Sequence, residues 1–339
     1  MKINMKIFVS MPVGSAVTNS FFTDEARAYI EGKYEVIYSD SEAHLSPDEI
    51  IEKAADCDVI MTGWGHTVLT YDILKNTKIK LIAHTGGTVA NVADQSVYEN
   101  GIKVFSGNII YAESVAEGVI GYMLTGLRRI PYYVDKVRNG EWHEPTPLTE
   151  GLLEQTVGII GLGTISRYLI KMLQAFNVNI KIYSSYKIDE QFLKENNAVQ
   201  VTSIEEIFSS CKIVSVHSAM NEKNRGMIGK EHFDLLQDGA LFINTARGAI
   251  IREDEMIEAL RENRFRAVLD VYCQEPLDLD SPLRKLENVY CIPHLGGPTI
   301  DRRGSVTKAL IDNVGKFERG EEAELEIKLE AAKRMTVGG

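Results

Sequence analysis

Cysteine is scarce in this sequence of 339 residues, which contains four: Cys57, Cys211, Cys273 and Cys291. No two of them have the Cys-x-x-Cys spacing of zinc and redox sites, and no histidine pattern of the zinc-binding kind lies near them. We therefore expect reduced, partly buried thiols and no metal site.

Long apolar runs and excess positive charge are also missing. No stretch approaches the ~20 residues of a membrane span, and the first residues, MKINMKIFVSMPVG, lack a signal-cleavage pattern. The 37 Lys and Arg residues stand against 48 Asp and Glu, a net charge of −11, which opposes non-specific binding to nucleic acid or anionic membranes. We expect a cytoplasmic protein that binds neither nucleic acid nor membrane, and in which local cations attract any anionic ligand.

Short β-rich runs alternate with helical patterns, which indicates parallel strands joined by crossover helices. The runs are Lys6–Ser10, Tyr34–Tyr38, Asp58–Thr62, Lys80–His84 and Lys103–Phe105, then Val157–Ile160, Ile180–Tyr183, Ile213–Val216, Ala240–Ile243, Arg266–Leu269 and Val289–Ile292. A long helical stretch, 112–138, separates the two groups, and an amphipathic helix at about 302–318 follows the second.

This pattern predicts two Rossmann-like, doubly wound α/β domains, each with a parallel sheet, and an active-site cleft between them. We expect a substrate-binding domain of residues 1–111 plus 303–339 and a dinucleotide-binding domain of residues 112–302. The tail from Glu321 has no clear purpose in the sequence, and we expect it to be solvated or a frayed helix.

A glycine turn, Gly161-Leu-Gly163, lies between a predicted strand and a predicted helix. Gly161 permits a tight turn, Gly163 lets a pyrophosphate approach the backbone, and the helix N-terminus offers unpaired N–H donors. Ser166 takes the third position of the dinucleotide fingerprint, where a small residue allows close packing. Strand, turn and helix in this order favour a cofactor site over a chance turn.

The end of the next strand is where NAD-binding proteins place an acid, and here the chain has Ser184, Ser185 and Lys187. Hydroxyls and a cation, without a carboxylate, would not repel the 2′-phosphate of NADP. We therefore expect NADP or NAD as the cofactor, with NADP favoured. The alternative is that Lys187 is an ordinary solvated turn residue.

Three further residues follow predicted strands: Arg247, Glu275 and His294. The planar fork of Arg247 can hold a carboxylate bidentately. His294 can exchange a proton near neutral pH, and Glu275 is a candidate to hold its second ring nitrogen. Taken singly, each has an ordinary alternative as a surface or core residue.

The motifs GIIGLGTIS, INTARGAIIREDEMIEAL, LDVYCQEP and IPHLGG resemble, in order and spacing, those of the D-isomer-specific 2-hydroxyacid dehydrogenases. The resemblance covers nearly the whole chain, including AESVAE at 112–117. It implies that Arg247 binds and polarises a 2-oxo acid, that His294 donates a proton to its carbonyl, and that Glu275 pairs with His294. It also implies that backbone amides at Gly87 and Thr88 hold the substrate carboxylate. The implied cofactor contacts, besides Gly161 and Gly163, are Thr164, Ile165, His217, Thr245, Ala246, Asp270, Gly296 and Gly297.

Two departures from the family pattern concern the ligands. Tyr111 stands where the family often has asparagine before AESVAE, and Ser184 stands where it usually has an acid. The first departure affects the substrate-side wall and the second affects the preference for NAD. Trp64 is a candidate wall of the substrate pocket, or an ordinary core aromatic.

We expect NAD(P)H-dependent reduction of a small 2-oxo acid, of glyoxylate, hydroxypyruvate or lactate type, to the D-2-hydroxy acid. The resemblance implies a homodimer joined through the nucleotide domain, with 112–138 as a candidate arm. The alternative is a nucleotide-sensing, corepressor-like binding protein, which this family also contains. A methyltransferase with a glycine-rich loop would leave Arg247, Glu275 and His294 unexplained.

Overall fold

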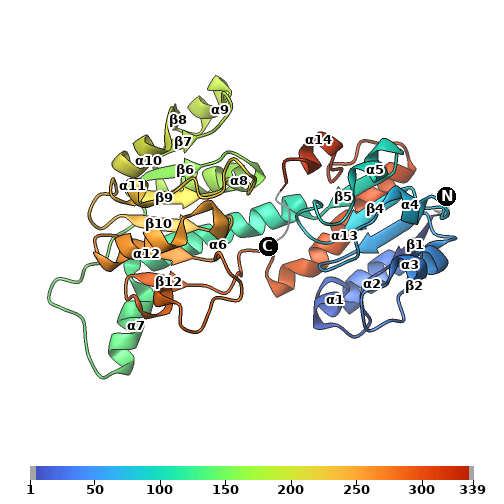
Figure 1. Ribbon diagram of the computed structural model, residues 1–339, viewed down its shortest axis with the longest axis horizontal. Helices are drawn as coiled ribbons and strands as arrows, with labels where there is room; N and C mark the ends of the chain where they lie inside the picture. Colours follow the sequence, from blue (N-terminus) through green and yellow to red (C-terminus); the bar gives the residue numbers. More distant parts are fainter. Residues whose placement is uncertain (1–4, 336–339) are drawn as a thin grey trace. The chain divides into compact units, whose positions relative to one another are not determined.

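The computed structural model describes residues 5–335 and divides into two compact α/β units. The first unit runs to Tyr111 and resumes at Pro298, whereas the second is continuous from Ala112 to Gly297 (Figure 1). The sequence pattern placed the return to the first unit at residue 303. Within the described residues, no helix is long and apolar enough to cross a membrane, and no cluster of His, Cys, Asp or Glu could hold a metal ion.

The first unit is built on a five-stranded parallel sheet with the order β2-β1-β3-β4-β5. Its strands are β1 (Lys6–Val9), β2 (Glu35–Tyr38), β3 (Val59–Thr62), β4 (Leu81–His84) and β5 (Lys103–Ser106). Since all strands are parallel, their carboxyl ends share one edge of the sheet. The loops that leave this edge are therefore neighbours, and they include the segments around Trp64 and Gly87.

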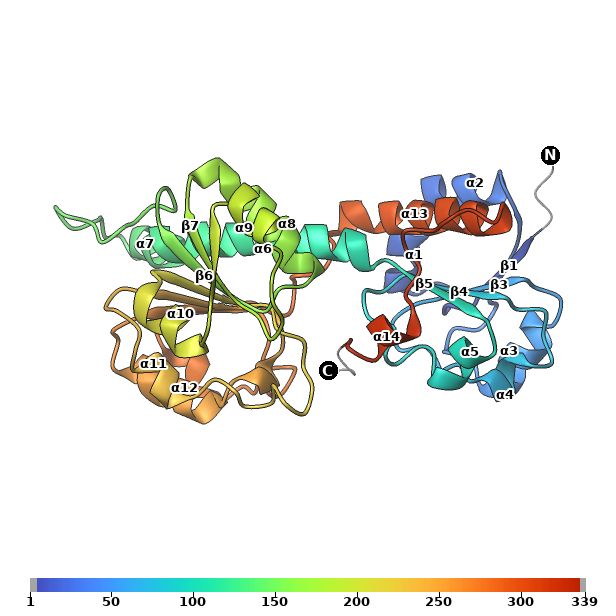
Figure 2. The same cartoon turned by 90° about the horizontal axis from the view of Figure 1, so that it is seen from above.

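Helices cover both faces of this sheet (Figure 2). One face packs against α1 (Ala16–Phe21), α2 (Asp24–Glu31) and α13 (Ile300–Glu318), and the other against α3 (Pro47–Ala54), α4 (Tyr71–Leu74), α5 (Gln95–Glu99) and α14 (Leu329–Ala332). The apolar stripe of α13, which includes Val306, Leu310 and Val314, is fully buried in a core shared with Ile7 and Val9 of β1. The last long helix thus completes the core of the first unit.

The segment after α13 corrects the expectation of a solvated tail. Glu326 forms an antiparallel bridge with Phe105 of β5, and the Ser106 N–H donates to the Leu325 carbonyl (3.1 Å). Leu325 and Ile327 are buried. Charged residues alternate with these apolar residues, so the composition of the segment is polar. The alternation nevertheless has the two-residue period of a β-strand, which suits a segment that packs along the edge strand β5.

The second unit contains seven parallel strands in the order β12-β11-β10-β9-β6-β7-β8, where six were expected. The strands are β6 (Thr156–Ile160), β7 (Asn179–Tyr183), β8 (Ala198–Val201), β9 (Ile213–Val216), β10 (Leu241–Asn244), β11 (Arg266–Leu269) and β12 (Val289–Cys291). The unexpected strand, β8, lies at the edge of the sheet. Because one side of an edge strand faces solvent, Val199 is 54 % exposed and the apolar signal is weak.

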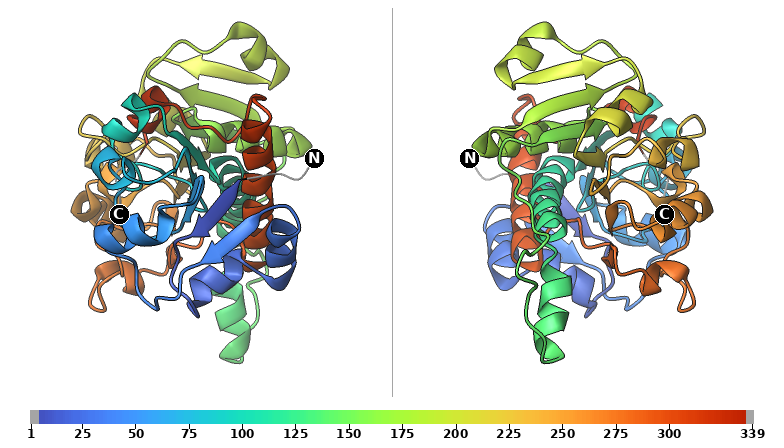
Figure 3. Two further views of the ribbon diagram at one scale, coloured as in Figure 1. Left: turned by 90° about the vertical axis from the view of Figure 1, so that its right-hand side faces the viewer. Right: turned by 90° about the vertical axis from the view of Figure 1, so that its left-hand side faces the viewer.

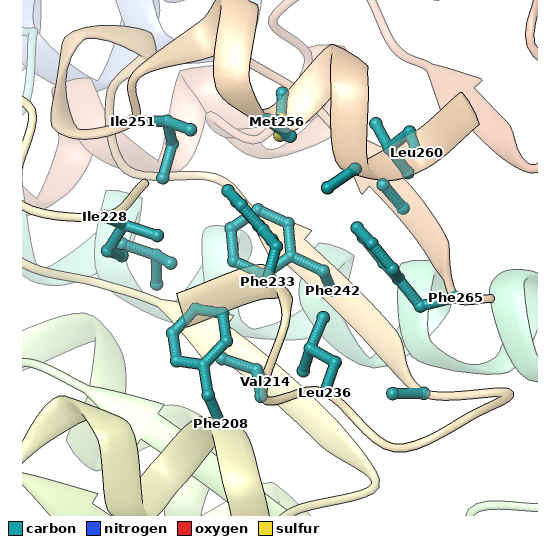
Figure 4. Packing of buried hydrophobic residues seen from close by; sticks show 14 of the residues in the cluster. Phe208, Val214, Ile228, Phe233, Leu236, Phe242, Ile251, Met256, Leu260 and Phe265 are labelled. Atoms are coloured by element: carbon teal, nitrogen blue, oxygen red, sulfur yellow. The ribbon is translucent and has the colours of Figure 1, made fainter. Parts of the chain in front are cut away.

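Helices also cover both faces of the second sheet. The helices α6 (Asn108–Arg128), α8 (Thr164–Leu173) and α9 (Glu190–Glu195) pack on one face, and α10 (Ile204–Ser210), α11 (Lys230–Phe233) and α12 (Glu253–Arg261) on the other. Phenylalanine rings pack against one another within the second of these cores (Figure 4). Phe233 stacks on Phe265 with ring centroids 5.7 Å apart and meets Phe242 edge to face at 5.2 Å. This core supports the strand ends that carry Arg247 and Glu275.

The stretch 112–138, expected as one helix, is divided in two. α6 ends at Arg128, Arg129 takes a left-handed backbone conformation (φ +52°), and α7 (Ile130–Arg138) begins with Pro131 in its first turn. Proline cannot donate the backbone hydrogen bond that a continuous helix would need at this point. α7 and the loop after it extend beyond the sheet of their unit (Figures 1 and 3).

Candidate active site

The glycine turn joins β6 to α8, the placement that the sequence predicts. Gly161 has φ +97°, and a Cβ there would lie 2.7 Å from the backbone nitrogen of Ser218, so only glycine fits. Gly163 faces open space at the N-terminus of α8. Ser166 is fully buried and donates a hydrogen bond to the Gly161 carbonyl (2.6 Å). The serine therefore braces the turn from inside, and the N–H groups of the first helical turn, at Thr164 and Ile165, are left for a ligand.

The predicted adenine-side residues lie in the loop after β7. Ser184 Oγ accepts a hydrogen bond from the Tyr186 N–H (3.4 Å), and Ser185 is exposed. Lys187 Nζ lies 3.1 Å from Glu190 Oε1, and both side chains are more than four-fifths exposed. Such a pair is weak, and it matches the alternative of a solvated turn residue. Ser184 is the member of this set whose position the fold constrains.

Tyr186 was not singled out in the sequence, and it connects the two cofactor loops. Its hydroxyl donates a hydrogen bond to the carbonyl of Leu162 in the glycine turn. Gln200 of β8 holds the same loop, since its side-chain amide donates to the Tyr186 carbonyl (2.8 Å) and accepts from the Ile188 N–H (2.9 Å). Because β8 was not predicted as a strand, there was no reason to expect from the sequence that the side chain of Gln200 would reach this loop.

Three more predicted cofactor residues follow β9 and β10. His217 Nε2 lies 2.8 Å from Ser215 Oγ, and burial lowers the pKa of His217 to about 4, so the ring is neutral. The Thr245 hydroxyl is buried and has no hydrogen-bond partner among residues 5–335. The Ala246 N–H donates to the side-chain oxygen of Asn244 (3.0 Å). Asn244 therefore fixes this loop at the strand end, a role that its sequence pattern does not indicate.

Arg247 lies in the same loop. Asn244 donates to the Arg247 carbonyl (3.0 Å), and the guanidinium donates to the carbonyl of the preceding residue (2.7 Å). The Arg247 Nε is buried and unpartnered within the described part of the chain. A Cβ on Gly248 would lie 1.9 Å from the Tyr272 carbonyl carbon, so this loop lies directly against the segment that carries Glu275. Burial lowers the pKa of Arg247, and the charge of Glu275 opposes that shift.

His294 and Glu275 are paired, as the sequence predicts. The Nδ1 of His294 lies 2.6 Å from one carboxylate oxygen of Glu275, and the other oxygen accepts from the Tyr272 N–H (3.0 Å). His294 adopts φ +52°, which is uncommon outside glycine, while its N–H bonds the carbonyls of Asp270 and Ile292, each at 3.0 Å. The ring is 45 % exposed and has Nε2 left to exchange a proton with a ligand.

Asp270 anchors the loop that follows the histidine. One of its oxygens accepts from the Leu295 N–H (2.7 Å) and from the Tyr122 hydroxyl (3.3 Å), and the other accepts from the Gly296 N–H (2.8 Å). A Cβ on Gly296 would lie 2.7 Å from the carboxylate, so the close approach requires glycine. Asp270 is 1 % exposed, and its buried carboxylate fixes the backbone of Leu295 and Gly296 next to His294. The cofactor contacts implied for Asp270, Gly296 and Gly297 stay predictions.

The loop predicted to hold the substrate carboxylate follows β4 in the first unit. His84 lies beneath it with Nδ1 2.9 Å from Thr62 Oγ1, and burial lowers the pKa of His84 to about 3, so the ring is neutral. Ser106 donates to the Gly87 carbonyl (3.3 Å). Gly87 and Thr88 are partly exposed above these supports. The loop backbone is thus braced by buried neutral groups, which place no negative charge beneath it.

Trp64 lies beside this loop in the first unit. Its ring meets Phe21 edge to face at 5.3 Å and Tyr111 at 6.3 Å, and it is 41 % exposed. The Tyr111 ring packs on the loop, since a Cβ on Gly87 would lie 3.2 Å from it. Such exposure is unusual for a core aromatic and favours the interpretation of Trp64 as a wall.

Comparison with known proteins identifies the family. The model described as "D-isomer specific 2-hydroxyacid dehydrogenase, NAD binding domain" matches residues 120–296, just over half of the chain. The hydroxypyruvate reductase of Thermotoga maritima is 30 % identical over 277 residues, which cover 80 % of this chain and 89 % of that protein. The chain belongs to the D-isomer-specific 2-hydroxyacid dehydrogenases.

Relatives of this chain differ in length, and a solved structure of low sequence identity shares its fold. The D-3-phosphoglycerate dehydrogenase of Methanocaldococcus jannaschii is 34 % identical over 282 residues, 83 % of this chain and 53 % of that protein. The chain thus spans about half the length of the phosphoglycerate dehydrogenases that it matches. The apo structure of D-mandelate dehydrogenase from Rhodotorula graminis has a TM-score of 0.79 at 18 % identity and covers 95 % of this chain and 97 % of its own.

The second unit of this family member fits the dinucleotide that the family description implies. Gly163 leaves room at the N-terminus of α8, where N–H groups and the helix dipole favour a pyrophosphate. The buried Thr245 hydroxyl lacks a partner within the described residues, so it offers a donor to a ligand at the neighbouring strand end. These residues support the use of NAD(P).

Proposed function

We propose that this protein reduces a small 2-oxo acid to the D-2-hydroxy acid with NADPH or NADH. The observation that carries the proposal is the 2.6 Å pair of His294 Nδ1 and Glu275 beside the partly buried Arg247. One cation, one proton donor and one orienting carboxylate are what carbonyl reduction requires of the protein. The cytoplasmic location stays a prediction from the sequence.

His294, Glu275 and Arg247 of the second unit have separate roles in the proposed reaction. A bound reduced nicotinamide would supply hydride to the carbonyl carbon. His294 donates the Nε2 proton to the carbonyl oxygen, and Glu275 keeps Nδ1 protonated and offsets the charge on the ring. Arg247 binds the 2-oxo acid through its guanidinium and polarises the carbonyl. The reverse reaction uses the same groups, with neutral His294 as the base.

In the first unit, the N–H groups at Gly87 and Thr88 are proposed to hold the substrate carboxylate. The loop they belong to is braced by Ser106 and by the neutral His84, so it adds no negative charge beneath the anion. Trp64 is proposed to border the substituent of the substrate. We propose a small 2-oxo acid of the glyoxylate, hydroxypyruvate or pyruvate type as the substrate.

For the cofactor we propose a preference for NADP, because Ser184 presents a hydroxyl where a carboxylate would repel the 2′-phosphate.

The wild-type protein should oxidise NADPH and NADH when supplied with glyoxylate, hydroxypyruvate or pyruvate, and should bind NADPH more tightly. Absorbance at the nicotinamide band and fluorescence titration measure the two properties. Tighter binding of NADH would refute the role of Ser184. No oxidation with any 2-oxo acid would refute the reductase and favour the nucleotide-sensing protein.

We also propose a homodimer formed through the second unit. α7 and the following loop expose a set of apolar side chains: Ile130, Val134, Val137, Trp142, Leu148 and Leu153. Trp142 is 71 % exposed, and large exposed aromatic residues of this kind are typical of protein interfaces.

Trp142→Asp should raise the dissociation constant of the dimer by about 30-fold or more, the effect of losing an interface hot spot. Analytical ultracentrifugation over a range of protein concentrations measures it. Leu279→Asp, at a residue 91 % exposed in another loop of the same unit, is the matched control and should leave the dimer intact. An unchanged dimer in Trp142→Asp would exclude this surface.

A further inference from the structure

Four side chains of the first unit form a cluster beside the proposed carboxylate loop: Phe21, Trp64, Tyr111 and Arg303. They come from the end of α1, the loop after β3, the first turn of α6 and the first turn of α13. Because the Tyr111 ring packs on Gly87 and meets Trp64 edge to face, the cluster is continuous with that loop. We refer to these four residues as the distal cluster.

Arg303 gives the cluster a positive charge that its hydrogen-bond acceptors do not neutralise. Its Nε donates to the Pro298 carbonyl (3.3 Å) and one terminal nitrogen to the Ser20 hydroxyl (3.1 Å), and both acceptors are uncharged. The guanidinium carbon lies 5.1 Å from the centroid of the Trp64 ring and 5.6 Å from that of Phe21. These contacts orient the fork of the arginine but leave its charge available to an anion.

The place of Arg303 in its helix makes this charge costly. α13 begins at Ile300, so Arg303 lies in the first turn, where the helix dipole disfavours cations. Elsewhere on α13 the cations are compensated, as where Lys308 pairs with Glu25. An oxyanion at Arg303 would be stabilised by both the guanidinium and the helix terminus.

Tyr111 contributes a second donor. Its hydroxyl is buried and has no hydrogen-bond partner in the described part of the chain. Burial raises the pKa of Tyr111, so the group stays protonated, and the guanidinium of Arg303 acts on it electrostatically. A buried donor without a partner is unfavourable until an acceptor is bound. Arg303 and Tyr111 therefore both present hydrogen-bond donors, so the cluster favours a ligand group that accepts hydrogen bonds over an apolar one.

We propose that the distal cluster binds an oxyanion at the far end of the substrate, so that the preferred 2-oxo acids carry a second carboxylate or a phosphate on their substituent. This inference rests on the proposed reductase activity and narrows its substrate class. Trp64 borders the carbon chain between the two anionic ends, and Arg303 is the residue that determines specificity.

The test compares kcat/KM within two pairs of substrates that differ at the far end. One pair is 2-oxoglutarate and its apolar analogue 5-methyl-2-oxohexanoate, and the other is 3-phosphohydroxypyruvate and hydroxypyruvate. The wild-type protein should favour the oxyanion-bearing member of at least one pair, and the pair that shows it distinguishes carboxylate from phosphate. Equal or higher kcat/KM for the neutral member of both pairs would overturn the proposal.

Arg303→Gln should lower this preference by about tenfold or more, since it removes a charge-assisted hydrogen bond. Arg303→Lys should restore part of it, because the charge remains without the fork. Lys308→Gln removes a charge from the same helix and should leave the preference unchanged. An equal loss for both members of a pair in Arg303→Gln would overturn the proposal. Glyoxylate has no substituent, so a wild-type protein that cannot reduce it or any substrate of the pairs would refute the reductase activity itself.

Discussion

Replacement of His294 by asparagine is expected to lower kcat for 2-oxo acid reduction by about 100- to 10,000-fold, the usual contribution of a general acid. Asparagine tolerates the left-handed backbone at this position (φ +52°), so the loop held by Asp270 should keep its conformation. What the variant loses is the proton at Nε2. Steady-state turnover at saturating substrate and cofactor measures the effect.

Cofactor binding provides the control for this variant. The glycine turn and Thr245 are unchanged, so the dissociation constant for NADPH should stay near that of the wild-type protein. Glu275→Gln tests the orienting role separately, because an amide can still hold Nδ1 but cannot offset the charge of a protonated ring. Its turnover should fall, but less than that of His294→Asn. Wild-type turnover in His294→Asn would exclude His294 as the proton donor.

Loss of the Arg247 guanidinium is expected to lower kcat/KM for the 2-oxo acid by about 100-fold or more, since two charge-assisted hydrogen bonds to the substrate are removed. Arg247→Ala makes this change, and Arg247→Lys should recover only part of the loss because an ammonium group cannot bind bidentately. The ratio of kcat/KM between variants and wild type is the measurement.

Arg225, one of the exposed arginines of the same unit, is the matched control for this loss of charge. Arg225→Ala should leave kcat/KM unchanged, whereas Arg247→Ala should act mainly through the oxo-acid step and leave NADPH binding intact. A fall in NADPH affinity that equals the fall in kcat/KM would place Arg247 at the cofactor and not at the substrate.

The parts predictable from the sequence are those whose signal is local. The glycine turn lies between an apolar strand and a helix, and Arg247 and Glu275 each follow a buried strand, so the order of residues places them at the carboxyl edge of the sheet. The pairing of His294 with Glu275 was expected because loops at that edge converge. In each case a short run of residues is enough to predict where the functional residue lies in the fold.

The parts that were missed depend on contacts between residues far apart in the chain. Edge strand β8 has little apolar burial of its own, and its Gln200 matters only once it reaches Tyr186. The cover of β5 by the segment around Leu325 requires a partner more than two hundred residues away. Arg303 and Trp64 carry no shared motif, and their proximity follows from the packing of α13 on α1.

The burial of α13 in the first unit also bears on the order of events during synthesis. Ile7 and Val9 of β1 are made well before the helix that covers them, which begins at Ile300. The second unit, from Ala112 to Gly297, leaves the ribosome complete while the first still lacks α13, which contributes several residues to its core. Since domains fold as units during synthesis, the second unit can fold first, and the part of the first unit that ends at Tyr111 must wait for α13. We expect chaperone binding to the nascent chain to be concentrated on residues 5–111, whose core is incomplete until α13 is made.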